Sequence, residues 1–167
     1  MVVRTPKSCF DEKQRQEKIF NRHWDSYFNR YYFIFEAGLD LDLMGVDRVF
    51  VNRKTGIPTT IEYKNDIMAG KTGRVFVESK ANVEFNTDGW IFTCKAMKLL
   101  IAVPTVGQVY ICDTARMRAE FPKWLEKFGT RKAFNGRYES EGVCLPLSVL
   151  VTVADAFITI GKPDGFT

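Results

Sequence analysis

The stretch Leu39–Asp66, LDLDLMGVDRVFVNRKTGIPTTIEYKND, decides the fold of this 167-residue chain. It contains two β-rich runs, LDLMGVDRVFV and TTIEYKND, which are joined by a segment containing the turn-forming residues glycine and proline. This pattern predicts a β-hairpin. If the hairpin turns around Lys54 and Thr55, antiparallel pairing places Asp47 about opposite Glu62.

The second strand of this hairpin has one charged face and one apolar face. Residues two apart in a strand share a face, so Glu62 and Lys64 project together, while Ile61 and Tyr63 face the other way. Asp47 then lies within cross-strand reach of Glu62. Two carboxylates this close repel each other unless a cation lies between them, and hard oxygen ligands with water suit Mg²⁺. The spacing therefore predicts a divalent metal site.

Such a site suits the hydrolysis of a phosphodiester bond. A bound metal lowers the pKa of a coordinated water and stabilises the negative charge that builds on a scissile phosphate. Lys64 would orient that water or neutralise the charge of the transition state. The backbone carbonyl of Tyr63 would supply a further ligand to the metal.

The segment before the hairpin has the apolar spacing of a helix. From about Asp11 to Ala37 the large apolar residues recur at helical intervals, and Gly38 supplies a natural stop. After the hairpin, the flexible AGKTG leads into RVFVES, which predicts a third strand from Arg74 to Ser79.

The second half of the chain predicts further strands and helices. LLIAV and QVYIC read as two strands separated by the turn PTVG. Asp113 is an expected N-cap for a helix that ends at Gly129, with a kink or break at Pro122. The remainder predicts a strand, a short helix capped by Ser148 and a final strand. The expected fold class is α/β, with a central mixed β-sheet flanked by helices.

Composition and length favour a single domain spanning residues 1–167. Hydrophobic residues make up 46% of the sequence and charged residues 26%, with no tract that resembles a linker. The N-terminal segment lacks the apolar core of a signal peptide, so we expect a cytoplasmic protein. The four cysteines form no CxxC pair, which argues against a zinc site or a disulfide framework.

The hairpin resembles the core of the PD-(D/E)xK, or restriction-endonuclease-like, nuclease superfamily. The resemblance is carried by GVDRVFV and TTIEYKND, with a helix before them, and by TGRVFVES and GWIFTCKA, which resemble small phage-type members. It implies a restriction-endonuclease-like core and a metal-dependent endonuclease. Two positions depart from the pattern: Val46 stands in place of the proline, and Arg74 stands where asparagine is expected.

Carried over residue by residue, the resemblance implies that Asp47 and Glu62 bind metal and that Lys64 is the catalytic lysine. Glu78 and Glu17 match positions where some members place additional carboxylates. The implied cofactor is Mg²⁺, with Mn²⁺ able to substitute. The implied partner is DNA, processed in recombination, repair or restriction. A lone catalytic centre that must cut both strands often works as a dimer, which makes a homodimer a candidate assembly.

Other residues have a functional and an ordinary interpretation. Three basic residues are candidates for phosphate contacts: Lys71, Arg74 and Lys80. Trp90 is a candidate for stacking on an unpaired base. The ordinary interpretation is a solvent-exposed side chain for the three basic residues and a core residue for Trp90. Several more have a surface or packing interpretation beside the functional one: His23, the competing ligands Asp40 and Asp42, and the basic residues Arg116, Arg118, Lys123, Lys127, Arg131, Lys132 and Arg137.

Three functions stay open from the sequence. The first is a metal-dependent deoxyribonuclease. The second is a nuclease-fold protein without catalysis that acts as a DNA-binding accessory or as a protein inhibitor. The third is a structural α/β domain that is indifferent to DNA. Retention of all three motif residues favours the first function, since loss of any one would prevent metal binding or the activation of the attacking water.

Overall fold

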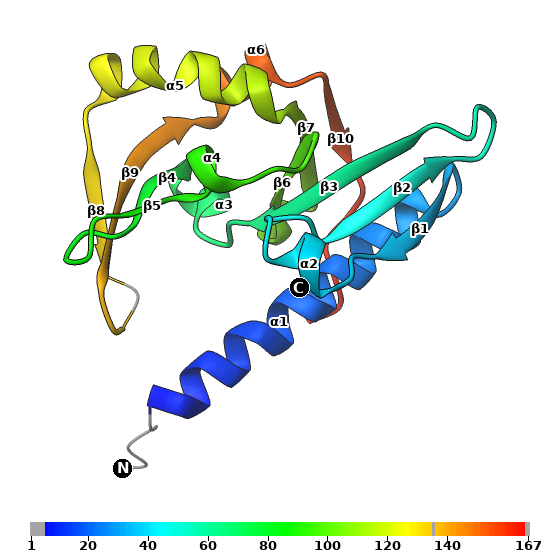
Figure 1. The fold of residues 1–167 in the computed structure, drawn as a ribbon, viewed down its shortest axis with the longest axis horizontal. Helices are drawn as coiled ribbons and strands as arrows, with labels where there is room; N and C mark the ends of the chain where they lie inside the picture. The colour runs from blue at the N-terminus through cyan, green and yellow to red at the C-terminus, as the bar shows by residue number, and fades with distance from the viewer. Residues whose placement is uncertain (1–5, 135, 166–167) are drawn as a thin grey trace.

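The computed structural model describes residues 6–134 and 136–165 and shows an α/β fold with two β-sheets (Figure 1). The larger sheet is mixed and has the order β1-β2-β3-β6-β7-β10, in which β3 and β6 are parallel. Its strands are β1 (Tyr32–Glu36), β2 (Arg48–Asn52), β3 (Pro58–Asn65), β6 (Lys98–Val103), β7 (Gln108–Asp113) and β10 (Ala156–Thr159).

The smaller sheet is antiparallel and has the order β5-β4-β9-β8. Its strands are β4 (Arg74–Asn82), β5 (Thr87–Asp88), β8 (Arg131–Phe134) and β9 (Glu139–Pro146). The helices are α1 (Pro6–Phe28), α2 (Leu39–Asp42), α3 (Ala69–Thr72), α4 (Trp90–Thr93), α5 (Thr114–Phe128) and α6 (Leu147–Val153), with a 3₁₀ turn, η1 (Pro104–Val106). The expected mixed sheet flanked by helices is therefore present.

The predicted hairpin is confirmed as β2 and β3. Arg48 pairs with Ile61 in the antiparallel register, so the next step along the two strands sets Asp47 opposite Glu62. The turn is closed by the side chain of Asn52, which accepts hydrogen bonds from the backbone N–H groups of Lys54 and Thr55 at 2.9 and 3.0 Å. This asparagine bond is the local feature that holds the register of the strands.

The predicted N-terminal helix is too long at its C-terminal end. Helix α1 ends at Phe28 rather than Ala37, and Tyr32–Glu36 forms β1, which pairs antiparallel with β2. The run YYFIF (residues 31–35) is made of aromatic and β-branched residues, which favour strands once a partner strand is available. Gly38 is therefore not the helix stop; it is the N-cap of the short helix α2, which replaces the start of the expected strand.

The downstream elements follow the sequence with three corrections. The strand that begins at Arg74 lies in the smaller sheet, where it pairs with β9 and β5. Helix α5 is capped by Asp113 and ends before Gly129 as expected, but it continues through Pro122 without a break. The cap of α6 is Pro146 rather than Ser148. Strands β5 and β8 were not predicted.

Two apolar clusters hold these layers together. Helix α1 covers one face of the larger sheet through Phe20, Trp24 and Phe28, which pack in a cluster with Phe50 and Leu100. The second cluster joins the other face of β6 and β7 to β4, β9, α4, α5 and α6. Full burial of one such large side chain contributes about 1.5–3 kcal/mol, so these clusters dominate the stability of the fold.

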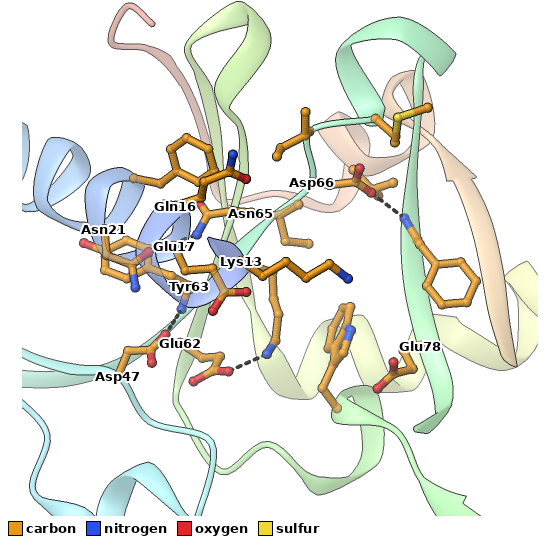
Figure 2. A pocket seen from close by; sticks show the side chains of 18 residues that line it. Lys13, Gln16, Glu17, Asn21, Asp47, Glu62, Tyr63, Asn65, Asp66 and Glu78 are labelled. Atoms are coloured by element: carbon orange, nitrogen blue, oxygen red, sulfur yellow. Dashed lines mark hydrogen bonds and ion pairs between the residues drawn. The ribbon is translucent and has the colours of Figure 1, made fainter. Parts of the chain in front are cut away.

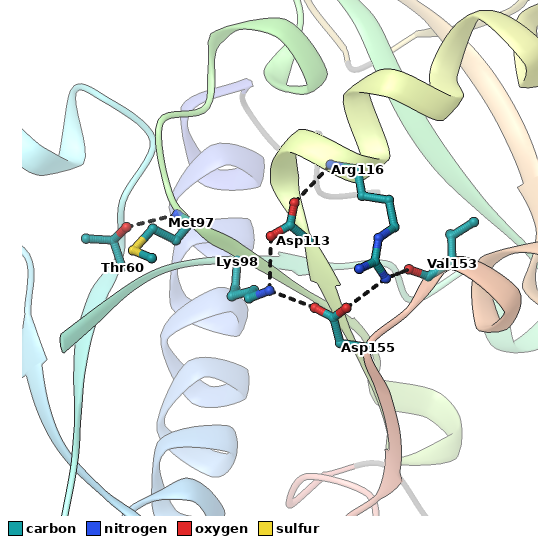
Figure 3. Close-up of polar contacts among 7 residues, drawn as sticks. All are labelled: Thr60, Met97, Lys98, Asp113, Arg116, Val153 and Asp155. Atoms are coloured by element: carbon teal, nitrogen blue, oxygen red, sulfur yellow. Dashed lines mark hydrogen bonds and ion pairs between the residues drawn. The ribbon is translucent and has the colours of Figure 1, made fainter. Parts of the chain in front are cut away.

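An ion-pair network joins the far end of the larger sheet to helix α5 (Figure 3). The Lys98 ammonium contacts the carboxylates of Asp113 and Asp155 at 3.0 and 2.7 Å, and Arg116 contacts Asp155 at 2.8 Å. Asp113 also accepts the backbone N–H of Arg116, which is its capping bond. Because the charges are shared among β6, β7, α5 and the approach to β10, the network fixes that corner.

The larger sheet has an exposed aromatic edge, and the core contains free cysteines. Strand β1 lies at one end of the larger sheet and exposes Phe33 (48%) and Phe35 (56%). Cys94 and Cys112 are buried free thiols, as expected for core cysteines, whereas the side chain of Cys9 lies outside the described residues. Among the residues that the structure describes, no helix has the length and apolar character needed to cross a membrane.

Candidate functional site

A pocket of about 550 Å³ lies where α1, the end of β3, β4 and the start of α4 meet (Figure 2). Its lining contains five carboxylates and two lysines, a formal charge of −3 in a chain whose net charge is +4. These residues are Glu17, Asp47, Glu62, Asp66, Glu78, Lys13 and Lys64. A concentration of acid in one pocket of a basic protein favours the binding of cations there.

Asp47 is fixed by backbone hydrogen bonds at the entry to β2. Its N–H donates to the carbonyl of Ile61 at 2.8 Å, and its Oδ2 accepts the N–H of Tyr63 at 2.8 Å. Because the N–H and C=O of one strand residue point to the same side, the carbonyl of Tyr63 points toward the side where Asp47 lies. The predicted juxtaposition of these groups is present.

Glu62 and Lys64 point into the pocket from the same face of β3. The Lys64 ammonium donates to Glu62 Oε1 at 2.5 Å. Burial raises the pKa of Glu62, and the charge of Asp47 raises it further against the opposing effect of Lys64. Burial alone would lower the pKa of Lys64, but Glu62 and Asp47 raise it overall. Lys64 is therefore a protonated donor at neutral pH.

A hydrogen-bonded network on the opposite face of the sheet supports this arrangement. Asp25 of α1 accepts from the Tyr63 hydroxyl at 2.8 Å and from Arg48 Nε at 3.0 Å. Arg48 also donates to the backbone carbonyl of Asp47 at 2.9 Å. The strand segments that carry Asp47 and Glu62 are thus tied to α1. The sequence pattern did not indicate a role for Asp25 or Arg48, although Arg48 directly follows the motif aspartate.

Glu17 reaches the pocket from α1. It is exposed at the pocket rim, yet partial burial raises its pKa; its carboxylate also interacts with the charges of Lys64 and Asp47. Helix α1 is held against β3 by Trp24, whose indole N–H donates to Asn65 Oδ1 at 2.8 Å, and by the bond from Asn65 to Asn21 at 2.9 Å. The position of Glu17 therefore depends on this clamp.

Glu78 lies on the opposite wall of the pocket from Asp47 and Glu62 (Figure 2). Burial raises its pKa, while Lys64 and the backbone N–H of Trp90 favour its charged form. Within residues 6–134 and 136–165, no three or more His, Cys, Asp or Glu side chains are grouped so that they could share one metal ion. Glu78 is therefore not brought together with the other two carboxylates.

Asp66 has a structural role that the sequence pattern did not predict. Its two carboxylate oxygens accept the backbone N–H groups of Ala69 at 2.9 Å and Phe76 at 3.0 Å. One side chain thus links the end of β3 to α3 and to β4. Its place directly after the ExK strand was visible, but the bond to β4 depends on tertiary structure. The distance between the two pocket walls depends on this carboxylate.

The remaining candidates lie away from this centre. Lys71 and Arg74 are exposed, and Lys80 pairs with Asp88 at 2.6 Å; none of the three lines the pocket, and their role with nucleic acid stays a prediction. His23 Nε2 is hydrogen bonded to the carbonyl of Gly161 at 2.9 Å, which fits packing.

The competing ligands and the basic segment also lie outside the pocket. Asp40 and Asp42 are exposed on α2, although the charge of Asp42 is felt by Glu62. In the basic segment, Arg118 donates to the carbonyls of Ile91 and Cys94. The other described bonds of this segment pair its basic side chains with carboxylates or carbonyl groups. The interpretation as an ordinary, partly offset surface therefore agrees with these contacts.

Comparisons with family models, curated proteins and solved structures found no match for this chain.

Proposed function

We propose that this protein is a divalent-metal-dependent deoxyribonuclease of the PD-(D/E)xK type. The observation that carries the proposal is the meeting of Asp47, Glu62 and Lys64 in one open pocket, with Asp47 bonded to the backbone of Tyr63. These are the residues that the resemblance assigns to metal and catalysis. An open carboxylate face also argues for a working enzyme over a protein that has kept the fold and lost catalysis.

The order of the elements supports a restriction-endonuclease-like core. Helix α1 precedes three antiparallel strands, β1, β2 and β3, and the chain then returns as β6 parallel to β3. The motif aspartate lies directly before β2 and the ExK residues lie on β3, as the resemblance requires. Residues 66–97, between β3 and β6, supply β4, β5 and the wall of the pocket opposite α1.

The donor set fits Mg²⁺. Two carboxylates and one backbone carbonyl are hard oxygen ligands, and Mg²⁺ in proteins commonly takes one or two carboxylates together with waters and substrate phosphate. The formal charge of −3 in the pocket indicates negative charge that a cation would compensate. When bound, Mg²⁺ supplies an activated water and charge stabilisation at the phosphate.

The chain's own residues have separate roles in this proposal. Asp47 and Glu62 hold the cation. Lys64, which is protonated, donates hydrogen bonds to the attacking water or to a phosphate oxygen as negative charge develops there. Glu17 at the rim and Glu78 on the opposite wall provide carboxylates for incoming water, and Asp66 keeps the two walls at a fixed separation.

The test is a cleavage assay on branched, single-stranded and duplex DNA in Mg²⁺ or Mn²⁺. We expect cleavage of at least one form, and we expect it to disappear with chelator, in Lys64→Ala and in Glu62→Gln. Glu120→Gln, a change far from the pocket on α5, serves as the matched control and should keep full activity. Intact DNA in every lane, with correctly folded protein, would overturn the proposal.

A further inference from the structure

The pocket contains apolar surface that neither metal binding nor phosphate binding uses. Met68 is 59% exposed and Ile67 is 36% exposed, and both line the same pocket as the carboxylates. Trp90 also lines it, half-buried, with part of its side chain packed against the core. Of the parts of a DNA strand, the nucleobase is the one that offers flat apolar faces to such a surface.

Trp90 is held in a fixed place beside the catalytic lysine. The Lys64 ammonium lies 5.9 Å from the centre of the Trp90 ring. Gly89 is the N-cap of helix α4, and its N–H donates to the carbonyl of Ser79 at 2.8 Å. A Cβ at Gly89 would come within 2.5 Å of the backbone oxygen of Glu78, so only glycine permits this approach to β4. The close approach of Gly89 to β4 thus fixes the backbone that leads into Trp90, and the ring packs partly against the core.

The size of the pocket limits what can enter it. A volume of about 550 Å³ lies in the range of pockets that enclose one small molecule, such as a single nucleotide. A base pair with both of its backbones does not fit into this pocket, because the major groove between the two backbones is by itself about 12 Å wide. A paired duplex would therefore have to lie across the mouth, with its bases still stacked on one another and unable to reach Trp90.

We infer that the nucleotide next to the scissile phosphate is unpaired and that its base stacks on Trp90, so that the substrate is single-stranded DNA or an unpaired flap. That this DNA is a substrate rests on the proposed nuclease function, but the stacking of the base on Trp90 is separate from cleavage. A phosphate that contacts Lys64 has its own base only one sugar away, and the Trp90 ring, 5.9 Å from the Lys64 ammonium, is within reach of that base. Met68 and Ile67 then border the same base.

Intrinsic fluorescence tests this binding directly. The chain has three tryptophans, and the other two, Trp24 (0% exposed) and Trp124 (4% exposed), are buried in the core. Stacking of a base on Trp90 should quench the one tryptophan signal that reaches the pocket. The measurement uses a short oligothymidylate with Ca²⁺ in place of Mg²⁺, and the same samples are checked on a gel for intact DNA.

The expected result is quenching by the oligothymidylate that is lost in Trp90→Phe and kept in the matched control Trp124→Phe. Trp90→Leu should weaken binding of the oligonucleotide by about 5- to 150-fold, which corresponds to the loss of one base–aromatic stack. An abasic oligomer of the same length should not quench, because it offers phosphates without bases. A paired duplex of the same sequence should also leave the fluorescence unchanged.

Two kinds of failure can be told apart. Quenching without cleavage of any DNA in Mg²⁺ or Mn²⁺ would overturn the nuclease proposal and leave the stacking inference standing. Equal quenching by the abasic oligomer or by the duplex, or quenching that persists in Trp90→Phe, would overturn the stacking inference whatever the cleavage assay shows. Faster cleavage of duplex than of single strands would also contradict it.

Discussion

At the scale of single residues, the chemistry of the pocket depends on Glu62. The residue is 8% exposed, and its carboxylate lies near both Asp47 and Lys64. Burial disfavours the charged form, and Lys64 only partly offsets that cost, so the pKa is raised. A carboxylate that must be ionised to bind a cation then competes with protons at a higher pH than an exposed glutamate does.

The first prediction concerns the pH dependence of cleavage at subsaturating Mg²⁺. Activity should fall as the pH is lowered, with an inflection above the ordinary glutamate pKa of 4.5, because protonated Glu62 cannot hold the metal. Raising the Mg²⁺ concentration should move the inflection to lower pH. The measurement is kcat/KM across pH at several Mg²⁺ concentrations, and an inflection that ignores Mg²⁺ would contradict the assignment.

Glu78 gives a second prediction, on stability. Burial raises its pKa, so the folded state binds this proton more tightly than the unfolded state does. Its stabilising contribution is present at low pH and is lost as the pH rises through the folded-state pKa. Glu78→Gln should therefore raise the midpoint of thermal unfolding at pH 8 by about 1–4 °C, and the gain should shrink near pH 4. Melts of both proteins in chelator provide the comparison; a gain that is constant with pH would argue against this.

At the scale of elements, the sequence predicted most strands but not the boundary between α1 and β1. The hairpin, β6, β7 and the Asp113 cap follow from local residue patterns. The residues from Tyr31 to Phe35 satisfy a helical spacing and a strand propensity at once, and the pairing with β2 decides between them. Strands β5 and β8 are short, and their pairing with β4 and β9 supplies the order that local sequence does not.

The cap of α5 gives a third prediction. Asp113 accepts the N–H of Arg116, and that bond and Lys98 lower the pKa of its carboxyl. Asp113→Ala should reduce the free energy of unfolding by about 0.5–2 kcal/mol, the usual loss for an N-cap. Asp113→Ser keeps a capping oxygen and should recover part of that loss. Urea unfolding at pH 7 measures both, and equal losses would show that the ion pair with Lys98, rather than the cap, matters.

At the scale of the whole molecule, the pocket exists because separate elements meet. The sequence located Asp47, Glu62 and Lys64, since two strands and one turn fix their spacing. The supporting residues could not be found that way. Asp25 and Asn65 act through partners far away in the chain, and the bond from Asp66 to Phe76 forms only because β4 folds back beside the end of β3. A hydrogen bond between α1 and β3, or across the pocket walls, leaves no local pattern in the sequence.

Metal binding gives a fourth prediction, which concerns global stability. A ligand that binds only the folded state stabilises it by about 2.7 kcal/mol at a concentration of 100 times its dissociation constant. Mg²⁺ without DNA should therefore raise the unfolding midpoint of the wild-type protein. Asp47→Asn keeps an oxygen for the Tyr63 N–H but loses the charge, so the rise should disappear while the fold persists. Unfolding monitored by circular dichroism with and without Mg²⁺ checks this, and an equal rise in both proteins would mean that the ion binds elsewhere.

The exposed phenylalanines of β1 have a consequence for the behaviour of the protein in solution. β1 is the terminal strand of its sheet, and Phe33 and Phe35 stand out on it with about half of their surface in water. A short apolar edge strand is a template for strand addition by another chain, and here Arg53, which lies 4.0 Å from the centre of the Phe33 ring, is the charge nearest to that ring. Crowded preparations of this protein should therefore become turbid first through contacts along β1, and chaperones or a partner strand would keep it dispersed.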